Sequence, residues 1–366
     1  MSTSTHVAIA STSKGKLGTV RVPTEEPAGG EVLIKVEYSA MIPPDAYIVD
    51  RGFLVSEADY PVIVGFTAAG TVVKVGKDVR DLKPGDRVTS FAYGASRNKG
   101  VQEYAIQPRS VCAKIPDNLS LEAAATIPDN FVCAFYTIFN QLSLTMPSSF
   151  PATQDPPQSD TPILIHGAGS TSGQYMIRLL HLARYKKILA TASSKHHDYL
   201  RSLGATDLFD YRSPTLVEDI NKAAGGPEKV TLAVDCISAE STMGILVKVV
   251  GPKGSVALLL PVKQGTTLNN GPDDELFLEW PIPDKFNPFQ KGTNLIGVRI
   301  FFYQTDQVLK ERLMPQILPE LLEKGLIEPT RLRLMDQGTL QQRVEQALDL
   351  FRDNKVSGEK LVIKIN

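Results

Sequence analysis

Apolar residues follow two different patterns along this chain, and the patterns divide it into regions. From about Val7 to Ile127, apolar and polar residues alternate in short runs punctuated by glycine and proline, as in Val32–Tyr38 and Thr71–Val75. Alternation with a period of two is typical of half-buried strands, so we predict a small antiparallel β domain here. In the middle of the chain, short continuous apolar runs are followed by apolar residues at helical spacing, which predicts a different architecture.

The apolar runs of the middle region predict strands buried on both faces, because they contain few polar residues. The runs are Pro162–Ile165, Lys187–Ala192, Leu208–Tyr211, Val230–Asp235, Ser255–Leu260 and Leu295–Ile300. Helical patterns or Gly/Pro loops separate them. Strands that alternate with helices predict a doubly wound parallel sheet with helices on both faces.

The rest of the chain contains two irregular stretches and a mixed end. Met146–Pro162 is polar and proline-rich, which predicts a surface loop, and Pro261–Lys291 predicts a long lid or binding loop that includes Trp280. After Leu313 the pattern predicts helices, and a final strand closes the chain. The predicted segments are helices Ile317–Glu323 and Leu340–Asn354 and the strand Lys360–Ile365.

A glycine cluster follows the first buried strand of the middle region and carries the clearest chemical signal. Its spacing is G-x-G-x-x-x-G, one residue longer than the usual dinucleotide fingerprint. Two glycines allow a tight turn close to a ligand, and the third lets the helix pack near the strand. Unpaired N–H groups at the helix N-terminus would bind a pyrophosphate. The predicted cofactor contacts are Gly167, Gly169, Ser170, Thr171, Ser172 and Gly173.

The end of the second buried strand indicates which dinucleotide is used. An NAD-binding fold usually has Asp or Glu here, to accept a hydrogen bond from the ribose 2′-OH. This chain has Ser193, Ser194 and Lys195 instead. Hydroxyls and a cation would hold a 2′-phosphate, which a carboxylate would repel, so NADP is favoured. The alternative is that the three residues form a solvated polar loop.

Composition excludes several classes of function. The 366-residue chain is long enough for two domains and has a net charge of −1, with no basic run to attract nucleic acid or anionic lipid. No apolar run approaches the length of a membrane span, and the N-terminal residues lack the pattern of a signal peptide. Its three scattered cysteines argue against a disulfide framework. We therefore expect a cytoplasmic protein without nucleic-acid or membrane partners.

Several further stretches, taken in order, resemble one family. They are Pro44–Tyr47 with Arg51–Gly52, Val64–Gly65, Gly70–Val72, Lys83–Val88, Ala123–Pro128, the Gly167–Gly173 loop, Leu203–Thr206 with Phe209–Tyr211, and Lys355–Val362. Together they resemble the medium-chain dehydrogenases/reductases, in the zinc-free quinone oxidoreductase and enoyl reductase branch. The proline-rich insertion and the Gly-Ser-Thr loop are most similar to fungal trans-acting enoyl reductases, which serve polyketide synthases.

The resemblance implies a fold and a domain division. It implies an α/β protein with a GroES-like, β-rich catalytic domain, residues 1–129 together with 303–366, and a Rossmann NADP-binding domain, residues 130–302. The active site is expected in the cleft between them. Zinc is not expected: Phe66-Thr67 stands where zinc members carry His-Glu, Ala40–Ile42 lacks the ligand cysteine, and Tyr93–Gln102 holds no cysteine.

The resemblance also implies roles for individual residues. Tyr47 is the candidate donor to an enolate oxygen, with packing in the cleft wall as the alternative. Lys360 matches a family lysine, with a solvated lysine on an edge strand as the alternative. Tyr211 matches a tyrosine near the 2′-phosphate, with a buried strand-end tyrosine as the alternative, and Cys133 stands at a usual threonine, with plain packing as the alternative. The further cofactor contacts implied are Pro44, Asp45, Cys133, Tyr211, Leu259, Leu260 and Lys360. Asp45 could simply shape its turn.

We therefore expect an NADPH-dependent oxidoreductase of secondary metabolism that reduces an activated C=C bond without zinc. The substrate would be an enone or an enoyl thioester, free or bound to a carrier protein. A quinone reductase and a nucleotide-binding paralogue without turnover remain alternatives. The sequence leaves open whether the protein is a monomer or a homodimer.

Overall fold

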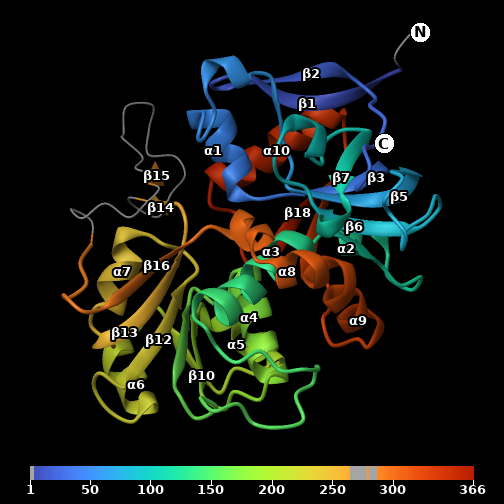
Figure 1. Cartoon of the computed structure of the whole chain (residues 1–366). Helices are drawn as coiled ribbons and strands as arrows, with labels where there is room; N and C mark the ends of the chain where they lie inside the picture. Colours follow the sequence, from blue (N-terminus) through green and yellow to red (C-terminus); the bar gives the residue numbers. More distant parts are fainter. Residues whose placement is uncertain (1–3, 264–277, 280–286) are drawn as a thin grey trace. The chain divides into compact units, whose positions relative to one another are not determined.

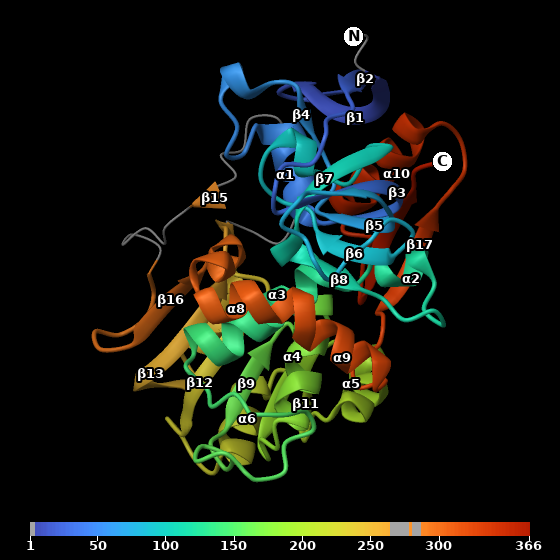
Figure 2. The same cartoon turned by 45° about the vertical axis from the view of Figure 1, so that its right-hand side comes forward.

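The computed structural model describes residues 4–263, 278–279 and 287–366. Contacts divide the chain into two compact units, residues 1–129 with 301–366 and residues 130–300, which can be followed by colour in Figure 1 and Figure 2. Most of the predicted lid loop, Trp280 included, lies outside the described residues. Across the part that is described, we find no helix with the length and apolar character needed to cross a membrane.

The first unit is built mainly of antiparallel strands, as the alternating pattern predicts. Within residues 4–129 and 301–366, one sheet has the order β17-β18-β3-β5-β6-β8, with β7 also paired to β3, and a smaller sheet has the order β2-β1-β4. The strands are β1 (Thr5–Ser13), β2 (Lys16–Pro23), β3 (Glu31–Met41), β4 (Val62–Ile63), β5 (Thr67–Val75), β6 (Arg87–Phe91), β7 (Tyr104–Pro108), β8 (Cys112–Lys114), β17 (Arg331–Met335) and β18 (Glu359–Lys364). Antiparallel pairing of β18 with β3 joins the end of the chain to its beginning.

Side chains cap the starts of α2, α8 and α10 in the first unit. The hydroxyl of Thr339 accepts a hydrogen bond from the N–H of Gln342, whose side chain accepts in turn from the N–H of Thr339. This capping box fixes the start of α10, whose buried face includes Val344, Leu348 and Phe351. The helices are α1 (Pro43–Arg51), α2 (Leu121–Ala124), α8 (Gln307–Arg312), α9 (Leu318–Glu323) and α10 (Leu340–Arg352), and α3 (Pro128–Phe135) spans the boundary between the units.

The second unit is the predicted doubly wound α/β sheet. Within residues 130–263 and 287–300, parallel strands follow the order β11-β10-β9-β12-β13-β16. The strands are β9 (Ile163–His166), β10 (Ile188–Ala192), β11 (Asp207–Asp210), β12 (Val230–Asp235), β13 (Val250–Leu259) and β16 (Asn294–Val298), with a short pair β14 (Val262–Lys263) and β15 (Leu278–Glu279). The helices are α4 (Thr171–Leu182), α5 (His197–Leu203), α6 (Leu216–Ala224) and α7 (Glu240–Leu246).

The strand order of the second unit determines where a ligand can bind. The direction in which the chain adds strands to the sheet reverses between β9 and β12. In sheets of this kind, ligands bind in a crevice at the carboxyl ends of the strands on either side of such a switch point. Leu164 and Leu189, on neighbouring strands, pack in one core cluster with Ile220 of α6 and Met243 of α7. This core holds the strand ends in fixed register.

The proline-rich stretch at residues 146–162 forms no helix or strand and has many exposed residues, as predicted for a surface loop, but it is anchored at two points. Phe150 is buried, with ring centroids 6.2 Å from Phe135 and 6.0 Å from Phe139. The N–H of Ala152 donates to the carbonyl of Leu182 at the end of α4, 2.8 Å away. The insertion therefore packs against the helices of its own unit.

Candidate active site

The glycine cluster forms the predicted strand–turn–helix between β9 and α4. Gly167 has φ of 75°, a left-handed conformation that favours glycine. A Cβ at Gly173 would lie 2.7 Å from the Cα of Ala168, so only glycine lets the first turn of α4 approach the strand this closely. The Ser170 hydroxyl accepts from the N–H of Gly173 and caps the helix.

The start of α4 fits a phosphate-bearing cofactor. Helix N-termini leave their first N–H groups without intrahelical partners. Among the described residues, the loop's hydrogen bonds account for the N–H groups of Ser170, Gly173 and Gln174, but not for those of Thr171 and Ser172. Two adjacent donors at the positive end of the helix dipole suit a pyrophosphate.

A buried polar network that the sequence did not predict lies beneath this loop. His166, at the end of β9, is hydrogen-bonded through Nδ1 to the hydroxyl of Thr191, at 2.8 Å. Asp235, at the end of β12, accepts from the N–H groups of Ile237 and Ser238, both at 2.9 Å. Burial lowers the pKa of His166, while the charge of Asp235 opposes that shift. The network fixes the carboxyl ends of adjacent strands and so positions the glycine turn.

The predicted 2′-phosphate residues come together at the ends of β10 and β11. Ser194 and Lys195 are exposed, and Tyr211 is 44% exposed, which rules out the alternative of a buried strand-end tyrosine. The Arg212 guanidinium lies over the Tyr211 ring, 4.6 Å from its centroid. Sequence reasoning missed Asp210, whose carboxylate accepts from the N–H of Ser194 at 3.2 Å. This edge therefore holds two exposed cations and one carboxylate.

The two leucines predicted near the nicotinamide are half-buried. Leu259 is the last residue of β13, and the N–H of Leu260 donates to the carbonyl of Val298 at 3.3 Å. Cys133 is buried in α3, where its carbonyl accepts from the Thr137 hydroxyl at 2.6 Å. Beyond the effect of burial, Cys133 is close enough to Cys236, the residue after β12, to raise the pKa of that thiol. Cys133 therefore lies near the strand ends of the second unit.

In the first unit, Pro44 and Asp45 lie at the start of α1. The Asp45 carboxylate accepts from the N–H of Ile42 at 2.9 Å and from the N–H of Gly65 at 2.7 Å. Asp45 therefore shapes the turn and ties the helix to the segment before β5. Burial raises the pKa of Asp45 to about 6, and the two backbone hydrogen bonds and the charges of Lys99 and Lys360 oppose that shift.

Tyr47 lies two residues further along α1 and is 4% exposed. Its ring meets Phe53 edge to face, with centroids 6.1 Å apart. Burial raises the pKa of Tyr47 above its ordinary value, so the hydroxyl stays protonated and can donate. Within the described residues it makes no hydrogen bond. A substrate oxygen would satisfy this donor.

Lys360 is buried in β18, not solvated on an edge strand. Its ammonium donates to the Asp129 carboxylate at 2.6 Å, and the two side chains are 4% and 3% exposed. β18 lies between β17 and β3. The cofactor contact implied for Lys360 remains a prediction, and the geometry gives this lysine a structural partner within its own unit.

Sequence reasoning also missed Lys99, which follows a short 3₁₀ turn before β7. The side chain is 4% exposed, and Nζ lies 3.5 Å from the centroid of the Phe66 ring. Phe66 is the residue for which the family resemblance implies a histidine ligand in the zinc members. Burial lowers the pKa of Lys99 to about 8, and the Asp45 carboxylate opposes that shift. Only its burial, not its sequence context, distinguishes it from an ordinary lysine.

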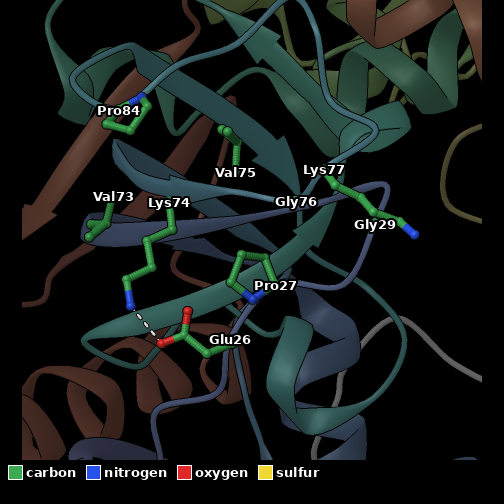
Figure 3. A pocket seen from close by; sticks show the side chains of 9 residues that line it. All are labelled: Glu26, Pro27, Gly29, Val73, Lys74, Val75, Gly76, Lys77 and Pro84. Carbon is green, nitrogen blue, oxygen red and sulfur yellow. Dashed lines mark hydrogen bonds and ion pairs between the residues drawn. The ribbon is translucent and has the colours of Figure 1, made fainter.

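A separate hollow of about 530 Å³ lies at the end of β5 (Figure 3). Lys74 and Glu26 form an ion pair at its rim, with 2.5 Å between Nζ and Oε1, while Lys77 points away from that pair. None of the predicted site residues lines it. Within residues 4–263 and 287–366, no three His, Cys, Asp or Glu side chains gather as metal ligands would.

Comparison with known proteins places the chain in a family. A model described as "Alcohol dehydrogenase GroES-like domain" matches residues 28–117, and one described as "Zinc-binding dehydrogenase" matches residues 173–273. The dehydrogenase pigH of Monascus ruber is 31% identical over 360 residues, covering 94% of each chain. The trans-enoyl reductase buaC of Petromyces alliaceus is 28% identical over 366 residues, covering 94% of this chain and 92% of its own.

Among solved structures, the CurK enoyl reductase superposes with a TM-score of 0.74 at 19% identity, covering 98% of this chain and 99% of that one. This likeness confirms the fold, a GroES-like domain followed by a Rossmann-type domain. The same fold is supported by the glycine turn, by the strand order of the second unit and by the match of both domain models. The chain belongs to the medium-chain dehydrogenase/reductase family, with fungal trans-enoyl reductases among its relatives.

Proposed function

We propose that this protein is an NADPH-dependent reductase of activated C=C bonds that works without zinc. The substrate class is an α,β-unsaturated carbonyl compound, with an enoyl thioester on a carrier protein as its natural form. The observation that carries the proposal is the likeness, over nearly the whole chain, to proteins named trans-enoyl reductases.

Residue types support a mechanism without a metal. A zinc alcohol dehydrogenase needs thiolate, imidazole or carboxylate ligands to hold its Lewis acid. Phe66 and Thr67 offer none of these at the position where relatives have His-Glu. Adding hydride to a C=C bond conjugated to a carbonyl needs no activated alcohol, only stabilisation of the enolate that forms. The family description mentions zinc, but within the described residues no three His, Cys, Asp or Glu side chains gather as metal ligands would.

The glycine turn and the strand ends would hold the cofactor. The N–H groups of Thr171 and Ser172 would bind the pyrophosphate, and Lys195 with Arg212 would contact the 2′-phosphate. When bound, reduced nicotinamide supplies the hydride. The negative charge of Asp210 would repel a 2′-phosphate at this edge. Its carboxylate accepts hydrogen bonds from the N–H groups of Ser194 and Arg212, and these bonds partly neutralise that charge. Two cations against one carboxylate favour NADPH over NADH.

Tyr47 would donate to the carbonyl oxygen of the substrate. As hydride adds to the β-carbon, the π electrons of the C=C bond move toward this oxygen, and a donor already in place lowers the barrier. The raised pKa of Tyr47 keeps the hydroxyl protonated, so it acts as a hydrogen-bond donor and not as an acid. The α-carbon then takes its proton from water, and each turnover consumes one NADPH and one proton.

The proposal is tested by following NADPH oxidation with a panel of enones, an enoyl thioester and quinones. We expect turnover of the enones and the thioester, with the saturated carbonyl as product. Turnover of quinones alone would make the protein a quinone reductase. Cofactor binding without any turnover would make it a nucleotide-binding paralogue.

A further inference from the structure

The largely buried side chain of Lys99 ends in an ammonium group without a polar partner among the described residues. Lys99 is 4% exposed, yet within the described residues its Nζ forms no hydrogen bond or ion pair. Its backbone, by contrast, is well held: its N–H donates to Ser96 and its carbonyl accepts from Gln102. Nζ is not among the fully enclosed side-chain atoms without a partner, so it keeps some access to solvent or to a ligand. Desolvating an ammonium is costly, and a ligand oxygen would offset that cost.

Two features hold the Lys99 side chain in its charged form. The Phe66 ring lies beneath Nζ, 3.5 Å away at its centroid, which is a close cation–π contact. The Asp45 carboxylate supplies the opposing charge at a longer range, since no ion pair joins the two groups. Asp45 in turn faces Lys360, which is paired with Asp129. No other titratable group acts measurably on Lys99 among the described residues.

The position of this ammonium is informative. It lies over Phe66, for which the family resemblance implies a histidine ligand in the zinc members, and it is close enough to Asp45, in the first turn of α1, to feel its charge. A zinc ion at such a position would supply positive charge to a carbonyl oxygen. A lysine ammonium can supply that charge together with a directed N–H donor.

We propose that Lys99 is a catalytic residue whose ammonium donates a charge-assisted hydrogen bond to the carbonyl oxygen of the substrate and stabilises the enolate. The inference rests on the proposed C=C reduction. Negative charge develops on the oxygen when hydride reaches the β-carbon, and Lys99 meets it without transferring its proton. Tyr47 supplies a neutral donor, and Lys99 supplies the charge.

The test compares Lys99→Met with the matched exposed-lysine variant Lys77→Met, using benzylideneacetone as the enone. Loss of one oxyanion donor predicts a fall in kcat of about 10²- to 10³-fold for Lys99→Met, with NADPH affinity intact. Because the mechanism needs the protonated ammonium of Lys99, wild-type kcat should fall as the pH rises through about 8. This alkaline limb of the pH profile should be absent in Lys99→Met. Lys77→Met should match wild type in both respects.

Two further readouts separate catalysis from packing. Removing a buried charge should leave the thermal stability of Lys99→Met equal to or above that of wild type, whereas a packing role predicts a loss. Phe66→Leu removes the cation–π contact and should move the alkaline limb to lower pH by about one unit. A Lys99→Met enzyme with kcat within about twofold of wild type, or with an unchanged alkaline limb, would overturn the inference.

A binding experiment distinguishes failure of this inference from failure of the proposed function. If wild type reduces no enone or thioester, the proposed function is wrong, and trans-cinnamate serves as a carboxylate probe of the holoenzyme by calorimetry. If wild type binds trans-cinnamate and Lys99→Met does not, Lys99 would still be supported as the group that contacts a substrate oxygen. Absent or unaltered binding would refute it together with the catalytic role.

Discussion

The buried ion pair between Lys360 and Asp129 offers a quantitative test of how the first unit is held together. Both side chains are at least 96% buried, and 2.6 Å separates Nζ from Oδ2. Lys360→Met keeps the aliphatic stem but leaves the Asp129 carboxylate in the core without its ammonium. Breaking one side of a buried pair costs about 3–5 kcal/mol, so we expect a loss of unfolding free energy in that range.

Hydrogen exchange of peptides from β3 and β18 measures this loss within the unit that contains the pair. Lys355→Met is the matched control: Lys355 and its partner Asp353 are 64% and 52% exposed, so that pair should contribute less than about 1 kcal/mol. Restoring an apolar core with Lys360→Met/Asp129→Leu should recover most of the stability.

A change below about 1 kcal/mol in Lys360→Met would refute the reasoning that the pair stabilises the fold. The same variant also tests the cofactor contact that the family resemblance implies for Lys360. Unchanged NADPH affinity in a destabilised variant would assign this lysine to structure. Weakened NADPH affinity with intact stability would assign it to the cofactor.

Other predictions concern the cofactor, the metal and single site residues. NADPH should bind at least about tenfold tighter than NADH, and Lys195→Ala should weaken NADPH alone; equal dissociation constants in a titration would contradict this. Elemental analysis should find no stoichiometric zinc, and a chelator should leave activity intact. Tyr47→Phe should lower kcat by roughly 10²-fold with KM little changed, and a kcat within about twofold of wild type would remove its hydroxyl from the mechanism. The pKa of Asp45 is raised to about 6 in the folded state, so between about pH 4 and 6 the folded protein binds more protons than the unfolded chain. The free energy of unfolding should therefore fall by about 3 kcal/mol as the pH rises through that window. Denaturation of wild type and Asp45→Asn across this range should show the difference in slope; parallel curves would argue against it.

Patterns of apolar residues were sufficient to predict an antiparallel, β-rich first unit and a parallel sheet in the second. Continuous apolar runs marked β9, β10 and β12 because strands buried on both faces carry few polar residues. Boundaries were less predictable: β13 begins at Val250, five residues before the predicted strand, because its first part contains Gly, Pro and Lys. The glycine turn was predictable because its φ angle and close packing require glycine at specific positions.

The missed residues share a property that the sequence does not show. Lys99, Asp210 and Asp235 are polar residues in unremarkable contexts. Lys99 and Asp210 contact residues elsewhere in the chain, whereas Asp235 accepts from N–H groups just beyond its own strand. Burial decides whether a lysine is solvated or held over a ring, and burial depends on tertiary packing. Lys360 illustrates the same limit, because its partner Asp129 is 231 positions away. Composition predicted the proline-rich surface loop but could not show that Phe150 within it is buried.

The fate of the hydride tests the central claim most directly. Wild-type protein would be incubated with benzylideneacetone and NADPH carrying deuterium at its transferable position, and the product analysed by mass spectrometry and NMR. The account predicts a saturated ketone with one deuterium on the β-carbon and a solvent-derived proton on the α-carbon. Deuterium on the carbonyl carbon, giving an allylic alcohol, would show carbonyl reduction and contradict the account.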